Sequence, residues 1–299
     1  MGTLVEITAY PATDRTRQAV NRAFARMEEI EDQADPYGSQ TLEDLRRGNP
    51  SLLPAALSRI LDVAMTVADR SSGAFDPTVG RAVRLWGFDG ADPGIPPDSD
   101  LTDAVKTFGY SHLAVGPDNV ARPLPPGRPL WLELGGVAKG YAVDEAADIL
   151  VQEGVEAGIV NAGGDLRSFG PRPGWGQWRI GIQDPDDPQG LLGVLKIEGG
   201  SVATSGDYER YFEKDGVRYH HILDPANGRP SRSGIRSVTV IAETCALADA
   251  LATAAFVMGP EKGLRLLETF TGVEGILVKA GGDLVVTSGI GERFDLERR

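Results

Sequence analysis

The residues best suited to chemistry are concentrated between Thr204 and Thr253. This stretch holds the segment HHILDPANGRP, which starts with His220 and His221, two of the three histidines in a chain of 299 residues. Imidazole is the side chain that most readily accepts a proton near neutral pH. Because adjacent residues of a strand point to opposite faces, we expect at most one of this pair to face a site, with a half-buried structural histidine as the alternative. A zinc site on the pair and Asp224 would be geometrically awkward.

Asp249 and Thr253 add oxygen ligands to the same stretch. They stand four residues apart in the alanine-rich segment ADALATAAF, so on a helix their side chains share one face. A carboxylate and a hydroxyl suit Mg²⁺, whose other ligands are commonly substrate phosphates and water. Two alternatives remain. One is a purely structural pair, and the other is a serine triad of Ser205, His221 and Asp249, which lacks the G-x-S-x-G elbow.

A second group of candidate residues lies in the turn ELGGVAKGYAVD at positions 133–144. Its two glycines let the backbone approach a ligand, and a helix starting near Lys139 would aim free N–H groups and a cation at the same space. The turn therefore resembles an anion cradle, although it is neither a Walker A loop nor a dinucleotide fingerprint, and a purely structural turn is the alternative. Asp144 and Glu145 are expected on the solvated face of this helix.

Strands and helices alternate along the chain, and many turns are marked by its 38 glycines and 20 prolines. The pattern predicts strands at 3–10 and 131–134 and helices at 14–33, 53–70, 139–153 and 244–257. Two similar segments, VNAGGDL at 160–166 and VKAGGDL at 278–284, predict hairpins turned at Gly-Gly-Asp and hence an antiparallel component. The Pro/Gly-rich region 87–130 is expected to form an excursion on the surface, not a linker between domains.

Composition excludes several classes of protein. A formal net charge of −13 argues against a nucleic-acid-binding surface, which would need clustered Lys and Arg. The single cysteine, Cys245, excludes an internal disulfide and a cysteine metal cluster. No apolar run reaches the 18 or more residues expected of a membrane span. The segment MGTLVEITAY lacks the features of a signal peptide, so a cytoplasmic location is expected.

Seven motifs in order resemble the ApbE-type FAD:protein FMN transferases. They are MGT at 1–3, GAFDPTVG at 73–80 with LWGF at 85–88, LGGVAKGYAVD at 134–144, VNAGGDL at 160–166, TSGDYERY at 204–211, HHILDPANGRP at 220–230 and ADALATAAFVMG at 248–259. The resemblance implies one mixed α+β domain over residues 1–299, with a T-fold-like core of largely antiparallel sheet flanked by helices. It also implies the reaction. FMN passes from FAD to a Thr or Ser hydroxyl of an acceptor protein with a D-x-x-[ST]-G-A-[ST]-like motif, and AMP is released.

The resemblance also implies roles for individual residues. Asp249, Thr253 and the backbone carbonyl of Gly136 match the Mg²⁺ ligands, and His221, not His220, matches the proposed base. The FAD-binding residues would be Met1, Ala74, Phe75, Asp76, Glu133 and Lys139, with Glu133 standing where relatives commonly carry Asp. The segment DPYGSQTLEDLRRGN is only a loose version of the family's serine-containing segment.

Two other functions use the same residues. A Mg²⁺-dependent FAD pyrophosphatase would employ water in place of the protein hydroxyl and give free FMN and AMP. A non-catalytic FAD-binding protein would need the cradle but not His221. Many relatives carry a lipoprotein signal, so a membrane-anchored extracytoplasmic lipoprotein is the alternative location if such a signal has been removed.

Overall fold

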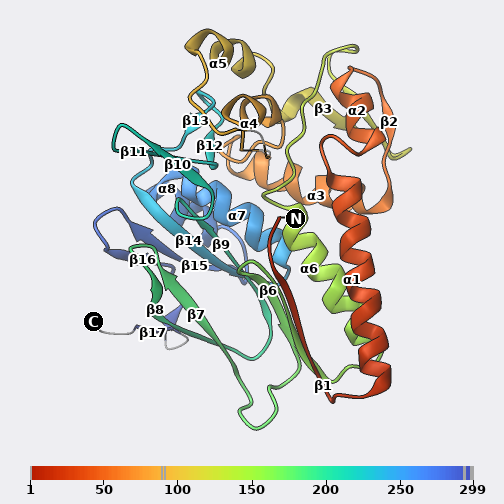
Figure 1. The fold of residues 1–299 in the computed structure, drawn as a ribbon, viewed down its shortest axis with the longest axis vertical. Coiled ribbons are helices and arrows are strands. Elements are labelled where there is room, and N and C mark those ends of the chain that lie inside the picture. The colour runs from red at the N-terminus through yellow and green to blue at the C-terminus, as the bar shows by residue number, and fades with distance from the viewer. Residues whose placement is uncertain (1, 89, 91, 292–293, 297–299) are drawn as a thin grey trace.

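The computed structural model describes residues 2–88, 90, 92–291 and 294–296, and its centre is an antiparallel sheet (Figure 1). Seven strands pair in the order β1-β5-β6-β9-β14-β15-β16. Their bounds are β1 Val5–Tyr10, β5 Ala157–Ala162, β6 Asp165–Phe169, β9 Gly200–Gly206, β14 Ile235–Ala242, β15 Glu274–Lys279 and β16 Leu284–Val286. The interior strand β14 is buried along nearly its whole length, because the sheet is covered on both faces.

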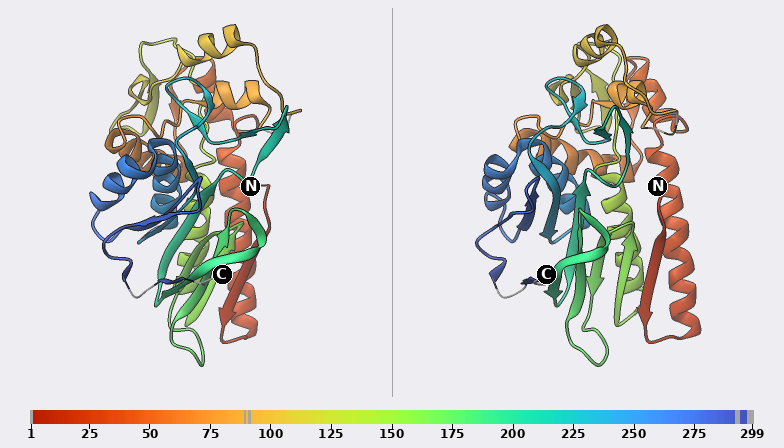
Figure 2. Two further views of the ribbon diagram at one scale, coloured as in Figure 1. Left: turned by 90° about the vertical axis from the view of Figure 1, so that its left-hand side faces the viewer. Right: turned by 60° about the vertical axis from the view of Figure 1, so that its left-hand side comes forward.

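Helices cover one face of this sheet (Figure 2). Helix α7 (Cys245–Met258) packs on β9 and β14, while α6 (Ala138–Gln152) packs on β5 and β6. Helix α1 (Asp14–Ala34) lies on α6, α3 (Ala55–Arg70) on α7, and α8 (Pro260–Glu268) on α7 and β15. The backbones of α6 and α7 approach so closely that a Cβ at Gly140 would overlap the carbonyl of Cys245. Small residues on both helices thus permit the contact that brings their polar groups together.

A smaller sheet covers the other face. It consists of β7 (Trp178–Asp184), β8 (Asp187–Ile197) and β17 (Phe294–Leu296), in the order β17-β8-β7. Along β7 the side chains alternate strictly between buried and exposed. The buried set, including Trp178 and Ile180, forms an apolar layer against side chains of the large sheet such as Val202 and Ile276.

The remaining elements form the upper part of the molecule in Figure 1. They are α2 Gln40–Arg46, β2 Ser51–Leu52, α4 Gly80–Trp86, α5 Asp98–Val105, β3 Leu113–Val115, β4 Val120–Pro123, β10 Tyr211–Lys214, β11 Val217–His220, β12 Leu223–Asp224 and β13 Arg229–Pro230. Trp86 joins two of these segments, because its indole N–H donates to the carbonyl of Gly228 at 2.8 Å and its ring stacks on Tyr219. The upper part supplies several loops that border the site.

The α+β class with a largely antiparallel sheet is confirmed, and so are both Gly-Gly-Asp hairpins, formed by β5–β6 and β15–β16. The strand predicted at 131–134 is wrong. This segment pairs with no strand, because its backbone bonds elsewhere: the N–H of Glu133 donates to Pro77 O at 2.8 Å, and Trp131 O accepts from the N–H of Gly80, at the start of α4, at 3.1 Å. Within the described part of the chain, no helix combines the length and apolar composition needed to cross a bilayer.

Candidate functional site

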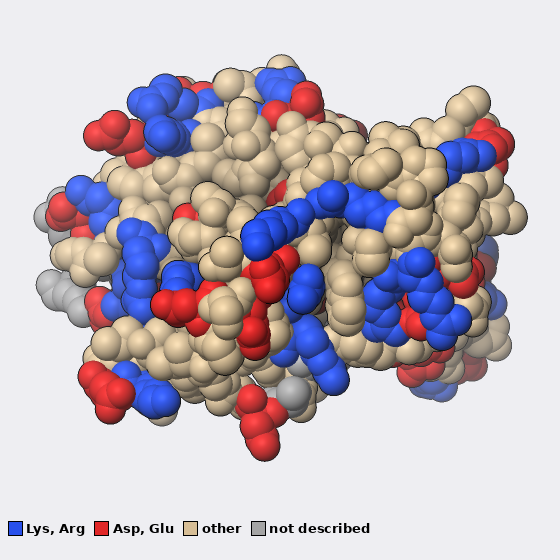
Figure 3. Space-filling view, turned by 90° about the horizontal axis from the view of Figure 1, so that it is seen from above, with Lys and Arg blue, Asp and Glu red and all other residues tan. Residues whose placement is uncertain are grey.

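A cavity of about 810 Å³ lies where the C-terminal end of α1, the loop before α6, the β9–β10 connection and α7 meet. Figure 3 views the molecule from the upper end, where basic and acidic side chains are interspersed around the middle of the face. All the predicted site residues that the structure describes line this one cavity: Ala74, Phe75, Asp76, Glu133, Gly136, Lys139, His221, Asp249 and Thr253. Met1, predicted to contact FAD, lies outside the described residues.

The junction of α6 and α7 places the predicted metal ligands. Asp249 is buried, and one of its carboxylate oxygens accepts a 3.3 Å hydrogen bond from the backbone N–H of Gly140 in the first turn of α6. Thr253 lies one turn further along α7, where its hydroxyl is 3.1 Å from that of Ser205. A Cβ built at Gly136 would be 3.2 Å from the Thr253 hydroxyl oxygen. The backbone of the glycine turn is therefore adjacent to the side chains of α7.

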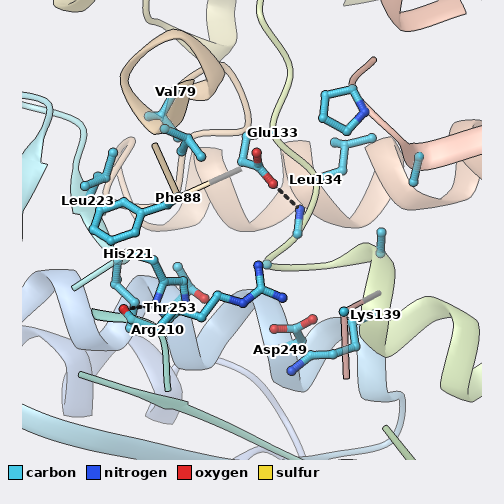
Figure 4. A pocket seen from close by; sticks show the side chains of 18 of the residues that line it. Val79, Phe88, Glu133, Leu134, Lys139, Arg210, His221, Leu223, Asp249 and Thr253 are labelled. Atoms are coloured by element: carbon cyan, nitrogen blue, oxygen red, sulfur yellow. Dashed lines mark hydrogen bonds between the residues drawn. The ribbon is translucent and has the colours of Figure 1, made fainter. Parts of the chain in front are cut away.

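Lys139 enters the cavity from the start of α6 (Figure 4). Its ammonium is 3.0 Å from a carboxylate oxygen of Asp165, a residue that is 1% exposed at the first position of β6. Burial opposes the charge of Lys139, but the carboxylates of Asp165, Asp249 and Glu209 outweigh it and raise the lysine's pKa. Burial also raises the pKa of Asp165 and Asp249. Lys139 is thus protonated at neutral pH and pairs with the buried carboxylate of Asp165.

His221 lies at the end of the β10–β11 hairpin and is half-buried in the cavity wall. Its Nδ1 is 3.2 Å from the carbonyl oxygen of Arg210, and its backbone N–H donates to the same oxygen at 3.0 Å. Since a carbonyl only accepts, Nδ1 carries the proton, and Nε2 is left as the basic nitrogen. Burial lowers the pKa of His221 to about 3, and the Arg210 guanidinium adds to the shift. The ring is neutral at pH 7, and its Nε2 keeps a lone pair.

Neither His220 as the base nor the serine triad receives geometric support. His220 is buried, packs edge-on against Phe256 at 5.4 Å, and its Nε2 is 3.0 Å from the carbonyl of Ser231. It is a core histidine that links β11 to the segment after β13. For the serine triad, the hydroxyl of Ser205 pairs with Thr253, and Asp249 bonds to the backbone of α6, not to His221.

The loop from Ser71 to Val79 forms the opposite wall. Asp76 is buried and bonds to the protein itself, accepting from the N–H and hydroxyl of Thr78 at 2.8 and 2.6 Å and from the N–H of Tyr110 at 3.1 Å. Burial raises its pKa, while these hydrogen bonds oppose the shift. The carboxylate thereby fixes the loop that presents Ala74 and Phe75 to the cavity. Glu133 similarly braces the glycine turn by accepting from the N–H of Gly135 at 2.9 Å.

Asp144 differs from its prediction. It was expected on a solvated helical face, but it is 6% exposed and accepts hydrogen bonds from the backbone N–H groups of Cys245 and Ala246, both at 2.9 Å. Arg167 donates to the same carboxylate at 3.2 Å. The carboxylate of α6 therefore caps the N-terminus of α7, the helix that carries Asp249. Glu145 is partly buried as well and pairs with Arg26 at 2.9 Å.

Comparison with known proteins agrees with this fold. The family model described as "ApbE family" matches residues 1–277. The chain belongs to the ApbE family. It is 35% identical to the FAD:protein FMN transferase of Vibrio cholerae over 249 residues, and this alignment covers 81% of this chain and 74% of that protein. Its identity to the FAD:protein FMN transferase of Treponema pallidum is 32% over 316 residues, covering 98% and 86%.

Solved ApbE structures share the whole architecture. The crystal structure of the ApbE protein from Thermotoga maritima superposes with a TM-score of 0.86 at 34% identity, covering 96% of this chain and 94% of that one. The flavin transferase ApbE from Vibrio cholerae gives a TM-score of 0.85 at 30% identity, covering 97% and 95%. The match along nearly the full length supports reading this chain as one ApbE domain.

The donor set of this ApbE-family site fits a magnesium ion. The buried carboxylate of Asp249, the hydroxyl of Thr253 and the adjacent backbone of Gly136 are hard oxygen donors, which Mg²⁺ prefers. Among the residues that the structure describes, no group of three or more His, Cys, Asp or Glu side chains could bind a metal by itself. Mg²⁺ tolerates this, because it commonly takes one or two carboxylates and completes its shell with phosphates and water.

Several polar residues of the ApbE site were not predicted from the sequence, among them Asp165 and Arg210. Asp165 is the last residue of the first Gly-Gly-Asp turn. The similar segment at 278–284 suggested that this aspartate serves only to form a turn, but its carboxylate pairs with Lys139. Arg210 lies in the TSGDYERY motif and lines the cavity beside His221. The sequence carries no signal for the Asp165 contact, because it depends on the packing of β6 under α6.

Proposed function

We propose that this ApbE-family protein transfers FMN from FAD to a Ser or Thr hydroxyl of an acceptor protein and releases AMP. Relatives named FAD:protein FMN transferase match most of the chain. The observation that carries the proposal is the neutral His221, whose Nδ1 is bound to Arg210 O and whose basic Nε2 borders the cavity that also holds Lys139 and Asp249. Phosphoryl transfer needs a proton acceptor and groups that bind phosphate, and the cavity brings His221 together with Lys139 and Asp249 at the α6–α7 junction, here called the anion-binding corner.

The bonds and protons balance in one step. The acceptor oxygen forms a phosphoester bond to the phosphorus of the FMN half of FAD, and the diphosphate bond to the AMP half breaks. His221 Nε2 takes the hydroxyl proton, which later passes to solvent, and the AMP phosphate leaves with the bonding electron pair. Nδ1, held by the Arg210 carbonyl, keeps the ring in the tautomer that this proton transfer needs.

The corner at the α6–α7 junction would stabilise the charge of the diphosphate. Lys139, whose raised pKa keeps it protonated, would contact a phosphate oxygen, while Asp165 orients its ammonium. Asp249, Thr253 and the carbonyl of Gly136 would hold Mg²⁺. When bound, the ion would offset negative charge on the diphosphate and on the departing AMP. The protein can thus be acidic overall and still bind a dianionic group locally.

Phe75, Ala74 and the loop fixed by Asp76 would contact a ring system of FAD, and Glu133 would brace the glycine turn beneath it. The acceptor would carry a D-x-x-[ST]-G-A-[ST]-like motif, as the resemblance implies. Binding of FAD alone would not require a positioned base. The tautomer of His221 therefore favours a catalytic function over storage of the flavin.

One experiment separates transfer from the alternatives. The protein is incubated with FAD, Mg²⁺ and a domain that carries the acceptor motif, and all products are weighed by mass spectrometry. We expect the acceptor to gain one FMN, and replacement of the motif's final Ser or Thr by Ala should prevent the gain. Free FMN with an unmodified acceptor would indicate a pyrophosphatase instead, and unchanged FAD would indicate a binding protein.

A further inference from the structure

The cavity contains few positive charges for a site that must hold a diphosphate. Among the described residues that line it, Lys139 and Arg210 are the only lysine and arginine, whereas Glu133, Glu209 and Asp249 are among several acidic ones. Lys139 already lies 3.0 Å from Asp165. Because that carboxylate offsets part of the lysine's charge, a further cation of the protein would strengthen binding of a diphosphate.

Arg210 is placed to supply it. The residue follows β9 in the connection to the β10–β11 hairpin, and its carbonyl oxygen accepts from both the backbone N–H and the Nδ1 of His221 at 3.0 and 3.2 Å. These two bonds fix the backbone of Arg210 to the base. In Figure 4 its guanidinium extends from the His221 side of the cavity toward Asp249 and Lys139. The side chain therefore crosses the cavity between the base and the anion-binding corner.

The reach of this side chain is also visible at the N-terminal segment. An ideal Cβ on Gly2 would lie 3.4 Å from Nη2 of Arg210. Both residues line the cavity. The side chain of Arg210 consequently reaches from the β9–β10 connection to Gly2, which precedes β1, at the border of the cavity.

We propose that Arg210 is a phosphate-binding residue that contacts the diphosphate of FAD from the side opposite Lys139. This inference rests on the proposed function and names a further residue of the same site. A guanidinium offers a planar pair of donors that matches two phosphate oxygens, whereas an ammonium acts as a point charge. Since its carbonyl holds His221, Arg210 would fix the distance between the base and the phosphate that the acceptor oxygen attacks.

A second consequence concerns the charge on His221. The positive groups near its ring are Arg210 and Lys139, and together with burial they keep it neutral. Removing the guanidinium lowers the positive potential at the ring, so the acid limb of the activity profile should move to higher pH. A residue that served packing alone would leave this limb in place.

The test compares Arg210→Gln and Arg210→Lys with Arg218→Gln. Arg218 lies on β11, pairs with Asp207 and Glu213 at 3.4 Å, and is not among the residues that line the cavity. Its replacement removes the same formal charge nearby. Each variant is titrated with FAD and with riboflavin, which lacks the phosphates, and its thermal unfolding is recorded to confirm the fold.

We expect Arg210→Gln to weaken FAD binding by about 10-fold or more and to change riboflavin binding by less than twofold. Arg210→Lys should recover part of the loss, and Arg218→Gln should match the unmodified protein. Equal FAD affinity in Arg210→Gln, or equal losses for FAD and riboflavin, would overturn the inference. If the unmodified protein bound FAD but transferred no FMN, the proposed function would fail, whereas the titrations would still decide the role of Arg210.

Discussion

Replacing Asp144 by Asn perturbs the connection between the two helices that build the site. The carboxylate accepts from the N–H groups of Cys245 and Ala246 at 2.9 Å, and Arg167 donates to it at 3.2 Å. An amide has one oxygen, so at least one buried N–H would face an NH₂ group and lose its partner. Each hydrogen bond to a charged group contributes about 1.5–3 kcal/mol. Loss of the charge at the N-terminus of α7 adds to this cost.

Part of that cost is offset, because burial raises the pKa of Asp144 and ionisation there is itself unfavourable. We therefore expect Asp144→Asn to lower the free energy of unfolding by about 2 kcal/mol. Asp148→Asn is the matched control on the same helix. Asp148 also pairs with Arg167, at 3.0 Å, but its side chain is 48% exposed, and such a pair contributes less than about 1 kcal/mol.

Urea-induced unfolding followed by circular dichroism measures both variants. The shifted N-terminus of α7 should also displace Asp249 from Gly140, so Asp144→Asn should need more Mg²⁺ for half-maximal activity than Asp148→Asn does. If the two variants unfolded within about 0.5 kcal/mol of each other and responded equally to Mg²⁺, the role assigned to Asp144 would be refuted.

Three further predictions concern the site and the helix contact. Asp249→Ala should raise the Mg²⁺ concentration for half-maximal activity by at least about 10-fold, and an unchanged response would remove this residue from the metal site. Gly140→Ala should destabilise the protein in thermal unfolding, because its Cβ would overlap the Cys245 carbonyl; an unchanged melting temperature would count against the close contact. Below about pH 6.5 His221 binds a proton in the unfolded chain, whereas in the folded chain it stays neutral until about pH 3. Protonation therefore favours the unfolded state, and the free energy of unfolding falls as the pH is lowered. His221→Gln should accordingly lose less unfolding free energy between pH 7 and 5, and equal losses would contradict the lowered pKa.

Much of the site could be predicted from local sequence. The spacing of Asp249 and Thr253 on one helical face, and the glycine turn before Lys139, depend on only a few neighbouring residues. The antiparallel hairpins were equally accessible, because their turns are marked by Gly-Gly-Asp.

The contacts that were missed are made by residues far apart in the sequence. Asp144 bonds to a helix that starts 101 residues later, and no local pattern indicates that its face of α6 is covered. Asp165 meets Lys139 only because β6 packs under α6. The segment at 131–134 has the composition of a strand, but its backbone bonds to Pro77 and to Gly80 at the start of α4, not to a strand.

The most direct measurement counts two products of one reaction. The protein is mixed with FAD, Mg²⁺ and the acceptor domain, and the AMP released is compared with the FMN attached to the acceptor over time. Transfer predicts one AMP for each FMN attached, and His221→Ala should slow both by about 100-fold or more while FAD still binds. AMP accompanied by free FMN and an unmodified acceptor, or a His221→Ala variant that is fully active, would contradict transfer with His221 as the base.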